Sequence, residues 1–194
     1  MEDELDFPLF ELPQIIFEQL LNLMDPMSLS NLSVMSKKSN FAVELYIKRG
    51  IPMHLTLRAP DYLKLQSAAY PGEIFLWKFY KSQGSEEEEN MKTVVVKGNL
   101  IKQSFTHQLE GPRVTYIHSL YFDRFEFTMK LWIENLLKIY GKPIDYVYLN
   151  LTPSYELGMN IMEWLKKMQG NFAEIIGVEG YGITMNNLRN HLEY

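Results

Sequence analysis

The chain has 194 residues, 46% of them hydrophobic and 22% charged, which is typical of a globular protein and excludes a disordered one. A net charge of −5 argues against a polyanion-binding protein, and the absence of cysteine excludes disulfides and thiolate metal or redox sites. No apolar run approaches the ~20 residues of a membrane span, and the acidic N-terminus is unlike the basic start of a signal peptide. We therefore expect a cytoplasmic or nuclear protein, with neither nucleic acid nor membrane as a partner.

Three short helices are predicted in the first fifty residues. Pro13 and Pro26 each stand in a first helical turn, where the missing N–H costs nothing. Asp25 is placed to cap the second helix, and Ser36 to cap a third that runs toward Gly50. The segment therefore has the pattern of a small helical module.

The first of these helices, predicted from residue 12 to 24, carries an unusually wide apolar surface. Only Gln14, Glu18 and Asn22 hold its polar side. The apolar residues spread over roughly two-thirds of the helical wheel, whereas a surface helix needs a stripe only a little wider than ~100°. The extra surface must meet either the downstream part of the chain or another protein, and the pattern alone leaves both interpretations open.

The fixed spacings in this segment resemble the F-box, in particular that of the large nematode F-box group. The resemblance rests on Leu12-Pro13, Ile16, Leu20, Met24-Asp25-Pro26, Leu29, Asn31-Leu32-Ser33 and Ser36-Lys37-Lys38, after a lead-in of Phe7-Pro8-Leu9. The chain differs from many F-boxes in lacking a tryptophan in the third helix, where Ser39 to Phe41 stand instead. The resemblance implies a three-helix fold that binds a Skp-type adaptor and, through it, the cullin of an SCF-type ubiquitin ligase. The adaptor-binding residues it implies are Leu9, Leu12, Pro13, Ile16, Leu20, Met24, Asp25, Pro26, Leu29, Leu32 and Ser33.

After Gly50 the pattern becomes extended. Strands are predicted at 53–58, 74–80, 93–96, 103–109 and 114–122, and we expect them to form an antiparallel meander. Gly98-Asn99 is predicted to form a tight hairpin turn, since both residues tolerate positive φ, and Gly111-Pro112 a second turn. The acidic stretch from Glu86 to Glu89 is interpreted as a solvated loop.

From Phe125 onward helices and strands alternate. A helix is predicted from Phe125 to Tyr140 and a second one after Thr152, with strands at 146–151 and 174–178. Trp164 follows Trp132 by 32 residues, and the other apolar positions of the two helices share this spacing. The pattern indicates an internal α/β repeat with parallel strands, although any two core helices can share such a frame.

This half also resembles the type-two F-box-associated domain, on the segments Val147-Tyr148-Leu149-Asn150-Leu151 and Glu163-Trp164-Leu165. That resemblance implies a substrate-recognition domain. We therefore expect an α+β protein with a three-helix F-box at residues 1–50. An F-box-associated or leucine-rich-repeat-like α/β domain is expected at 51–194. Because a third helix would begin only at Thr184, we expect this domain to be truncated at its C-terminus.

No sequence motif for catalysis or cofactor binding is recognised. There is no phosphate loop, nucleophile elbow or His-Glu metal helix, and we predict no catalytic residue, cofactor or metal site. The histidines, which lie far apart in the sequence, are interpreted as structural or surface residues; they are His54, His107, His118 and His191.

The expected function is therefore that of a non-catalytic adaptor that brings an unidentified target protein to a ubiquitin ligase. Two other hypotheses remain. In the first, the chain is a protein-interaction module unrelated to ubiquitin, and its N-terminal helices cap an α/β repeat domain. In the second, it is an α/β enzyme.

Overall fold

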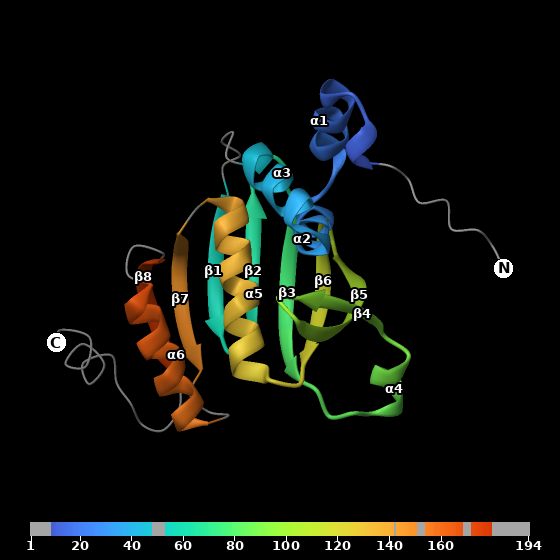
Figure 1. Cartoon of the computed structure of the whole chain (residues 1–194). Coiled ribbons are helices and arrows are strands. Elements are labelled where there is room, and N and C mark those ends of the chain that lie inside the picture. Colours follow the sequence, from blue (N-terminus) through green and yellow to red (C-terminus); the bar gives the residue numbers. More distant parts are fainter. Residues whose placement is uncertain (1–8, 48–52, 142, 151–153, 169–171, 180–194) are drawn as a thin grey trace.

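The computed structural model describes residues 9–47, 53–141, 143–150, 154–168 and 172–179 (Figure 1). Three N-terminal helices are followed by a mixed β-sheet and two longer helices, which confirms the expected α+β class in outline. After a 3-10 turn at Leu9–Glu11, the helices are α1 (Gln14–Leu23), α2 (Pro26–Met35), α3 (Lys37–Ile47), α4 (Glu86–Glu89), α5 (Phe125–Tyr140) and α6 (Tyr155–Lys167). The strands are β1 (Met53–Ala59), β2 (Tyr62–Ser67), β3 (Glu73–Lys81), β4 (Lys92–Val96), β5 (Asn99–Glu110), β6 (Arg113–Phe122), β7 (Ile144–Asn150) and β8 (Phe172–Glu179).

Side-chain caps fix where α2 and α3 begin, as the sequence predicts. The Asp25 carboxylate accepts hydrogen bonds from the amides of Met27 at 2.8 Å and Ser28 at 3.0 Å. The Ser36 hydroxyl accepts one from the amide of Ser39 at 3.0 Å, and the Ser39 hydroxyl accepts one from the amide of Ser36 at 2.9 Å. These bonds satisfy amides that have no partner within the helix.

The predicted antiparallel meander is wrong in part. The sheet has eight strands in the order β4-β5-β6-β3-β2-β1-β7-β8. β3 pairs in parallel with β6, and the chain between them forms α4 and the β4–β5 hairpin at the edge of the sheet. The strand β2, which the sequence analysis did not predict, lies between β1 and β3 and pairs antiparallel with both. A parallel pair needs a long connection, and the α4–β4–β5 segment provides it.

The turn between β4 and β5 lies one residue earlier than predicted. Val96 pairs with Asn99, so Lys97 and Gly98 are the two turn residues. Their φ angles are 48° and 79°, and positive φ at both central residues is the mark of a type I′ hairpin turn. Gly98 takes this conformation without steric cost, whereas Lys97 is the one described non-glycine residue with positive φ.

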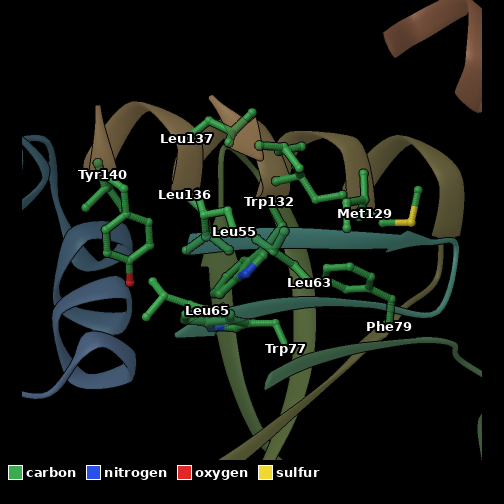
Figure 2. Close-up of a cluster of buried hydrophobic side chains, with 14 of the residues drawn as sticks. Leu55, Leu63, Leu65, Trp77, Phe79, Met129, Trp132, Leu136, Leu137 and Tyr140 are labelled. Atoms are coloured by element: carbon green, nitrogen blue, oxygen red, sulfur yellow. The ribbon is translucent and has the colours of Figure 1, made fainter. Parts of the chain in front are cut away.

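The main core lies between the sheet and α5. Trp132, Leu136 and Tyr140 of α5 face Leu65 and Trp77 of the sheet (Figure 2). Alternate residues along β1, β2 and β3 point into this core, so the intervening residues lie on the opposite face. In Figure 1, α5 and α6 lie on one side of the sheet, with α2 and α3 at one end of that side.

The last described units have the predicted α/β order. β7 and β8 pair in parallel with α6 between them in sequence, which confirms the predicted parallel pairing. The corresponding positions Met129 and Ile161 are both buried. The paired tryptophans differ, however: Trp132 is fully buried, while Trp164 is half-buried and donates a hydrogen bond from Nε1 to Glu134 at 2.9 Å. The internal repeat stays a prediction, and the helix expected from residue 184 lies outside the described residues.

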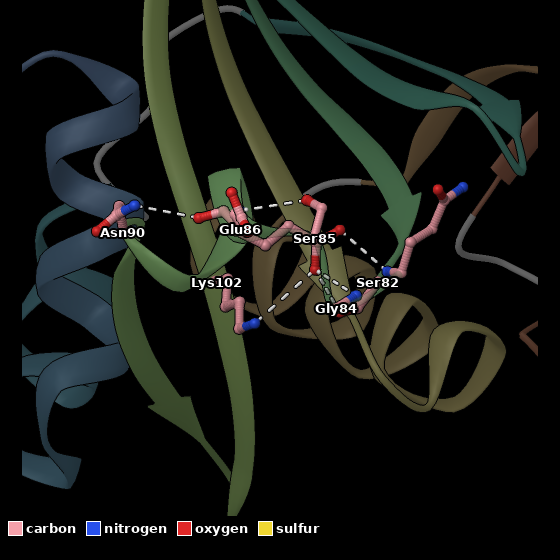
Figure 3. Close-up of polar contacts among 8 residues, drawn as sticks. Ser82, Gly84, Ser85, Glu86, Asn90 and Lys102 are labelled. Atoms are coloured by element: carbon pink, nitrogen blue, oxygen red, sulfur yellow. Dashed lines mark hydrogen bonds and ion pairs between the residues drawn. The ribbon is translucent and has the colours of Figure 1, made fainter.

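The interpretation of the acidic stretch as a solvated loop is wrong for Glu88. The stretch forms α4, and the Glu88 side chain turns inward with 4% of the residue exposed. Its carboxylate accepts hydrogen bonds from the Ser82 hydroxyl at 2.5 Å and from the amides of Gln83 at 3.0 Å and Gly84 at 3.3 Å. Lys102 lies 3.8 Å away (Figure 3). These donors compensate the burial of the charge, whereas the other three glutamates of the helix are exposed.

We expect Glu88→Gln to lower the melting temperature at neutral pH. The Ser82 hydroxyl, and after it the Gln83 amide, holds the pKa of Glu88 below its ordinary value of 4.5. The pKa of Glu88 is therefore lower in the folded state than in the unfolded state. The ionised carboxylate stabilises the fold at pH values above the unfolded-state pKa. This stabilisation is lost as the pH falls through the folded-state pKa. Thermal denaturation should therefore show a difference from wild type at neutral pH that shrinks in acid.

The matched control for this experiment is Glu87→Gln, since Glu87 lies on the exposed side of the same helix. We expect the control to melt like wild type at both pH values. Equal melting temperatures for Glu88→Gln and Glu87→Gln at neutral pH would show that the buried carboxylate does not stabilise the fold.

Candidate protein-binding site

Helix α1 is anchored by one side and exposes apolar residues on the other. Leu21 is 2% exposed, and Phe17 packs against the core. In contrast, Leu23 is 83% exposed, Ile15 66% and Ile16 41%. The alternative in which this helix is buried on both sides within the chain is therefore wrong. A cluster of large apolar side chains exposed on one short helix is a feature of protein-binding surfaces.

Contacts at both ends of α1 hold it in place. The Phe10 and Phe17 rings lie 5.6 Å apart, and the Lys38 ammonium of α3 lies 4.7 Å from the centre of the Phe10 ring. At the other end, the Tyr70 hydroxyl donates a hydrogen bond to the Met24 carbonyl at 3.3 Å. In Figure 1, α1 lies beyond the end of the sheet, with α2 and α3 between it and the strands. The exposed side chains are therefore presented on a fixed helix.

Further exposed apolar residues lie on α2 and α3. Met35 ends α2, while Phe41 and Leu45 are four residues apart and so share one side of α3. All are more than half exposed. The sequence analysis did not assign these three residues to the binding site. Phe41 stands near the place where many F-boxes carry a tryptophan. Its i, i+4 spacing with Leu45 could have identified it, because the two residues lie opposite the buried Ser39 and Val43 on the helix.

The buried sides of α2 and α3 are joined to α5. The Tyr140 hydroxyl donates a hydrogen bond to the Pro26 carbonyl at 3.0 Å and points toward the N-terminal helices in Figure 2. Burial raises the pKa of Tyr140 far above its ordinary value, so the hydroxyl keeps its proton. Asn135 donates to the Ser33 hydroxyl at 3.2 Å and accepts from the Asn40 amide at 3.1 Å.

These contacts, together with a hydrophobic cluster that continues from the N-terminal helices into the sheet, make one packed body. The boundary expected near residue 50 therefore does not separate two packing units. The N-terminal helices and the sheet should unfold together, because neither part can be removed without exposing the core of the other.

The adaptor-binding residues that the F-box resemblance implies differ in their exposure in the structure. Pro13 and Ile16 are exposed, and Leu12, Leu20, Met24 and Asp25 are half-buried. The buried members are Pro26, Leu29, Leu32 and Ser33. Leu9 lies in the 3-10 turn, and its side chain is outside the described residues. The four buried side chains are packed within the chain in this structure, and the assignment of the set to adaptor binding stays a prediction.

Among the histidines, His118 is structural. It is fully buried between the Phe105 ring, 4.1 Å away between centroids, and the Trp132 ring, 5.7 Å away. Its Nε2 shares a hydrogen bond of 2.8 Å with Gln103, and burial lowers its pKa to about 3, so it is neutral at physiological pH. His54 and His107 are exposed, and His191 lies outside the described residues. Across the described ranges, no three His, Cys, Asp or Glu side chains are grouped as metal ligands would be.

No protein-family model matches the chain, and comparison with curated proteins and with solved structures finds no match either. Among the helices that the structure describes, none is long and apolar enough to cross a membrane. The function is therefore inferred from the residues and the geometry given above.

Proposed function

We propose that this protein is a substrate-recognition adaptor of a cullin–RING ubiquitin ligase. In this proposal, α1 and its neighbours bind a Skp-type adaptor, and the sheet domain holds a target protein. The exposed apolar surface of α1 is the observation that carries the proposal. Three large side chains, Ile15, Ile16 and Leu23, face solvent on a helix that is already anchored by its other side.

The energetics of burial support a partner for this surface. Burying one such side chain fully stabilises a complex by about 1.5–3 kcal/mol, so a partner that covers all three gains several kcal/mol. The gain is usable because α1 is held in position before binding, which lowers the entropic cost of association. The geometry thus fits a site for a partner with an apolar groove, which is what the F-box resemblance implies.

The function of such an adaptor requires no chemistry of its own. A target held by the sheet domain would be kept near the ubiquitin-loaded enzyme, so that its lysines react at a raised effective concentration. The junction through Tyr140 and Asn135 fits this function, because it ties the sheet domain to α2, the helix next to α1.

The second candidate is a protein-interaction module unrelated to ubiquitin, in which the N-terminal helices cap the sheet domain. The continuous core favours this candidate, since capping helices share the core of the domain they protect. The two candidates differ in what they require of α1. A cap needs only the buried side of α1, whereas an adaptor-binding helix also needs the exposed side.

The test is to mix the purified chain with a purified Skp-type adaptor and measure hydrogen exchange in both. We expect a stoichiometric complex in which amide exchange slows in α1 and α3 but not at the β5–β6 hairpin. Failure to form a complex, or a complex that leaves exchange in α1 unchanged, would refute the proposal and favour the second candidate.

A further inference from the structure

The face of the sheet opposite α5 carries a band of tyrosines and basic side chains. One row of paired residues crosses four strands and consists of Tyr148 on β7, Arg58 on β1, Tyr62 on β2 and Lys78 on β3. The neighbouring row contains Tyr146 and Lys64. Helices α5, α6, α2 and α3 lie on the other side (Figure 1), while the short helix α4 lies at the β5 edge of this side, where Glu88 approaches Lys102. We define the open face as the outward side of β7, β1, β2, β3 and β6.

The charge on the open face has the opposite sign to that of the whole chain. The outward positions of β1, β2, β3 and β6 include Arg58, Lys64 and Lys78 but no Asp or Glu. The chain as a whole has a net charge of −5. The charged side chains at the outward positions of these four strands are therefore positive, which favours a negatively charged partner.

The charges at the rims are paired, whereas those at the centre are not. Asp61 lies 3.5 Å from Arg58 at one rim, and Glu88 lies 3.8 Å from Lys102 at the other. Within the residues that the structure describes, Lys64 and Lys78 form no ion pair. They are the charges that a partner could neutralise without first displacing a carboxylate.

The spacing of the two lysines fits an extended peptide. Lys64 pairs with Leu76 and Lys78 with Tyr62, so the lysines are diagonal neighbours, about 7–8 Å apart. Alternate residues of an extended chain point to the same side and are about 6.5–7 Å apart. Two acidic residues separated by one other residue would therefore meet both ammonium groups.

Tyrosines around the lysines supply apolar contact and hydroxyl groups. Tyr146 and Tyr148 are each about two-fifths exposed, at 42% and 39%. Tyr80 is similarly exposed and stacks on Tyr121 with ring centroids 5.1 Å apart. Tyrosine is enriched in protein-binding surfaces because it buries a large area with little loss of side-chain freedom.

We infer that the open face binds a short acidic segment of a target protein, in which acidic residues alternate with others. The inference rests on the proposed function, since it names the surface and the chemistry that would hold the target. A single-stranded nucleic acid is the less favoured occupant. The central cations are few, and the carboxylates of Asp61 and Glu88 bound the site at both rims, which suits a short peptide better than a long polyanion.

The test uses a fluorescein-labelled synthetic peptide in which glutamate alternates with serine and tyrosine, without any adaptor. We expect binding that weakens with added salt and shifts the amide NMR signals of Tyr62, Lys64 and Lys78. Lys64→Ala with Lys78→Ala should weaken binding about tenfold, as expected for two partly exposed charge contacts. The matched control, Lys92→Ala with Lys167→Ala, removes two exposed lysines elsewhere and should bind like wild type.

Several outcomes would overturn the inference. The first is that the peptide does not bind. The second is that the two double variants bind the peptide equally well. The third is that a peptide with lysine in place of glutamate binds as tightly as the original. Tighter binding of a single-stranded RNA through the same two lysines would assign the face to nucleic acid instead. Adaptor binding, measured in parallel, should be unchanged by Lys64→Ala with Lys78→Ala. If the wild-type chain did not bind the adaptor, the proposed function alone would be refuted, because the peptide assay contains no adaptor.

Discussion

Replacing Trp132 with alanine is expected to lower the free energy of unfolding by about 3–5 kcal/mol, as for other large aromatic residues removed from a core. Trp132 has no exposed surface and lies at the centre of α5 against the sheet, with its ring 5.7 Å from the buried His118 ring of β6. Because the core continues into α2 and α3, the loss should appear in those helices as well as in the sheet. Urea denaturation followed by circular dichroism measures the free energy of unfolding. Amide exchange in α2 measures the effect on the N-terminal helices.

Phe127→Ala is the control for Trp132→Ala, since Phe127 lies on the same helix but is 47% exposed. Among the described residues, its one ring interaction is with the Arg124 guanidinium. Its replacement should cost no more than about 1 kcal/mol. If Trp132→Ala unfolded the sheet while α2 kept its protection, the N-terminal helices would have a core of their own, and the single packed body described above would be wrong.

The double variant Ile15→Asp with Ile16→Asp is expected to weaken binding of a Skp-type adaptor by more than about 2 kcal/mol, or roughly 30-fold in Kd. Both side chains face solvent, so the charges desolvate only when a partner covers them. The melting temperature should change little for the same reason. Isothermal titration calorimetry gives the affinity, and thermal denaturation gives the stability.

The control for this variant is Leu109→Asp, an equally apolar and 71% exposed position near the tip of the β5–β6 hairpin. It should bind the adaptor like wild type. Equal affinity for the wild type and the Ile15/Ile16 variant would remove α1 from the interface. Unfolding of that variant would show that the exposed side of α1 has a structural function instead.

Local signals in the sequence predicted the helix boundaries well, because each depends on neighbours along the chain. Asp25 caps α2 through bonds to residues two and three positions away, and Gly141 ends α5 in a left-handed conformation with φ of 58°. The alternation of Leu63 and Leu65 with polar residues also marks β2. That strand was not among the predicted ones.

The environment of the site could not be predicted in the same way, because it depends on distant residues. Helical periodicity shows that α1 has a wide apolar surface but not which part of it is covered. The inward Ser33 of α2 bonds to Asn135 of α5, which lies 102 residues later in the chain. Glu88 resembles its exposed neighbours in sequence, and only the meeting of Ser82 and Lys102 around it distinguishes it.

The bond from Tyr140 to the Pro26 carbonyl joins residues 114 positions apart, which has a consequence for synthesis on the ribosome. The first helices leave the ribosome early, but the side chains that complete their packing belong to α5, which is made much later. Contacts of such long sequence separation form slowly, because the intervening chain must be ordered first. Until α5 emerges, the Pro26 carbonyl and the Ser33 hydroxyl lack their α5 partners, so the packing of α2, which lies next to α1, is incomplete. A nascent or prematurely terminated chain that lacks α5 would therefore not present the native α1 surface to a partner.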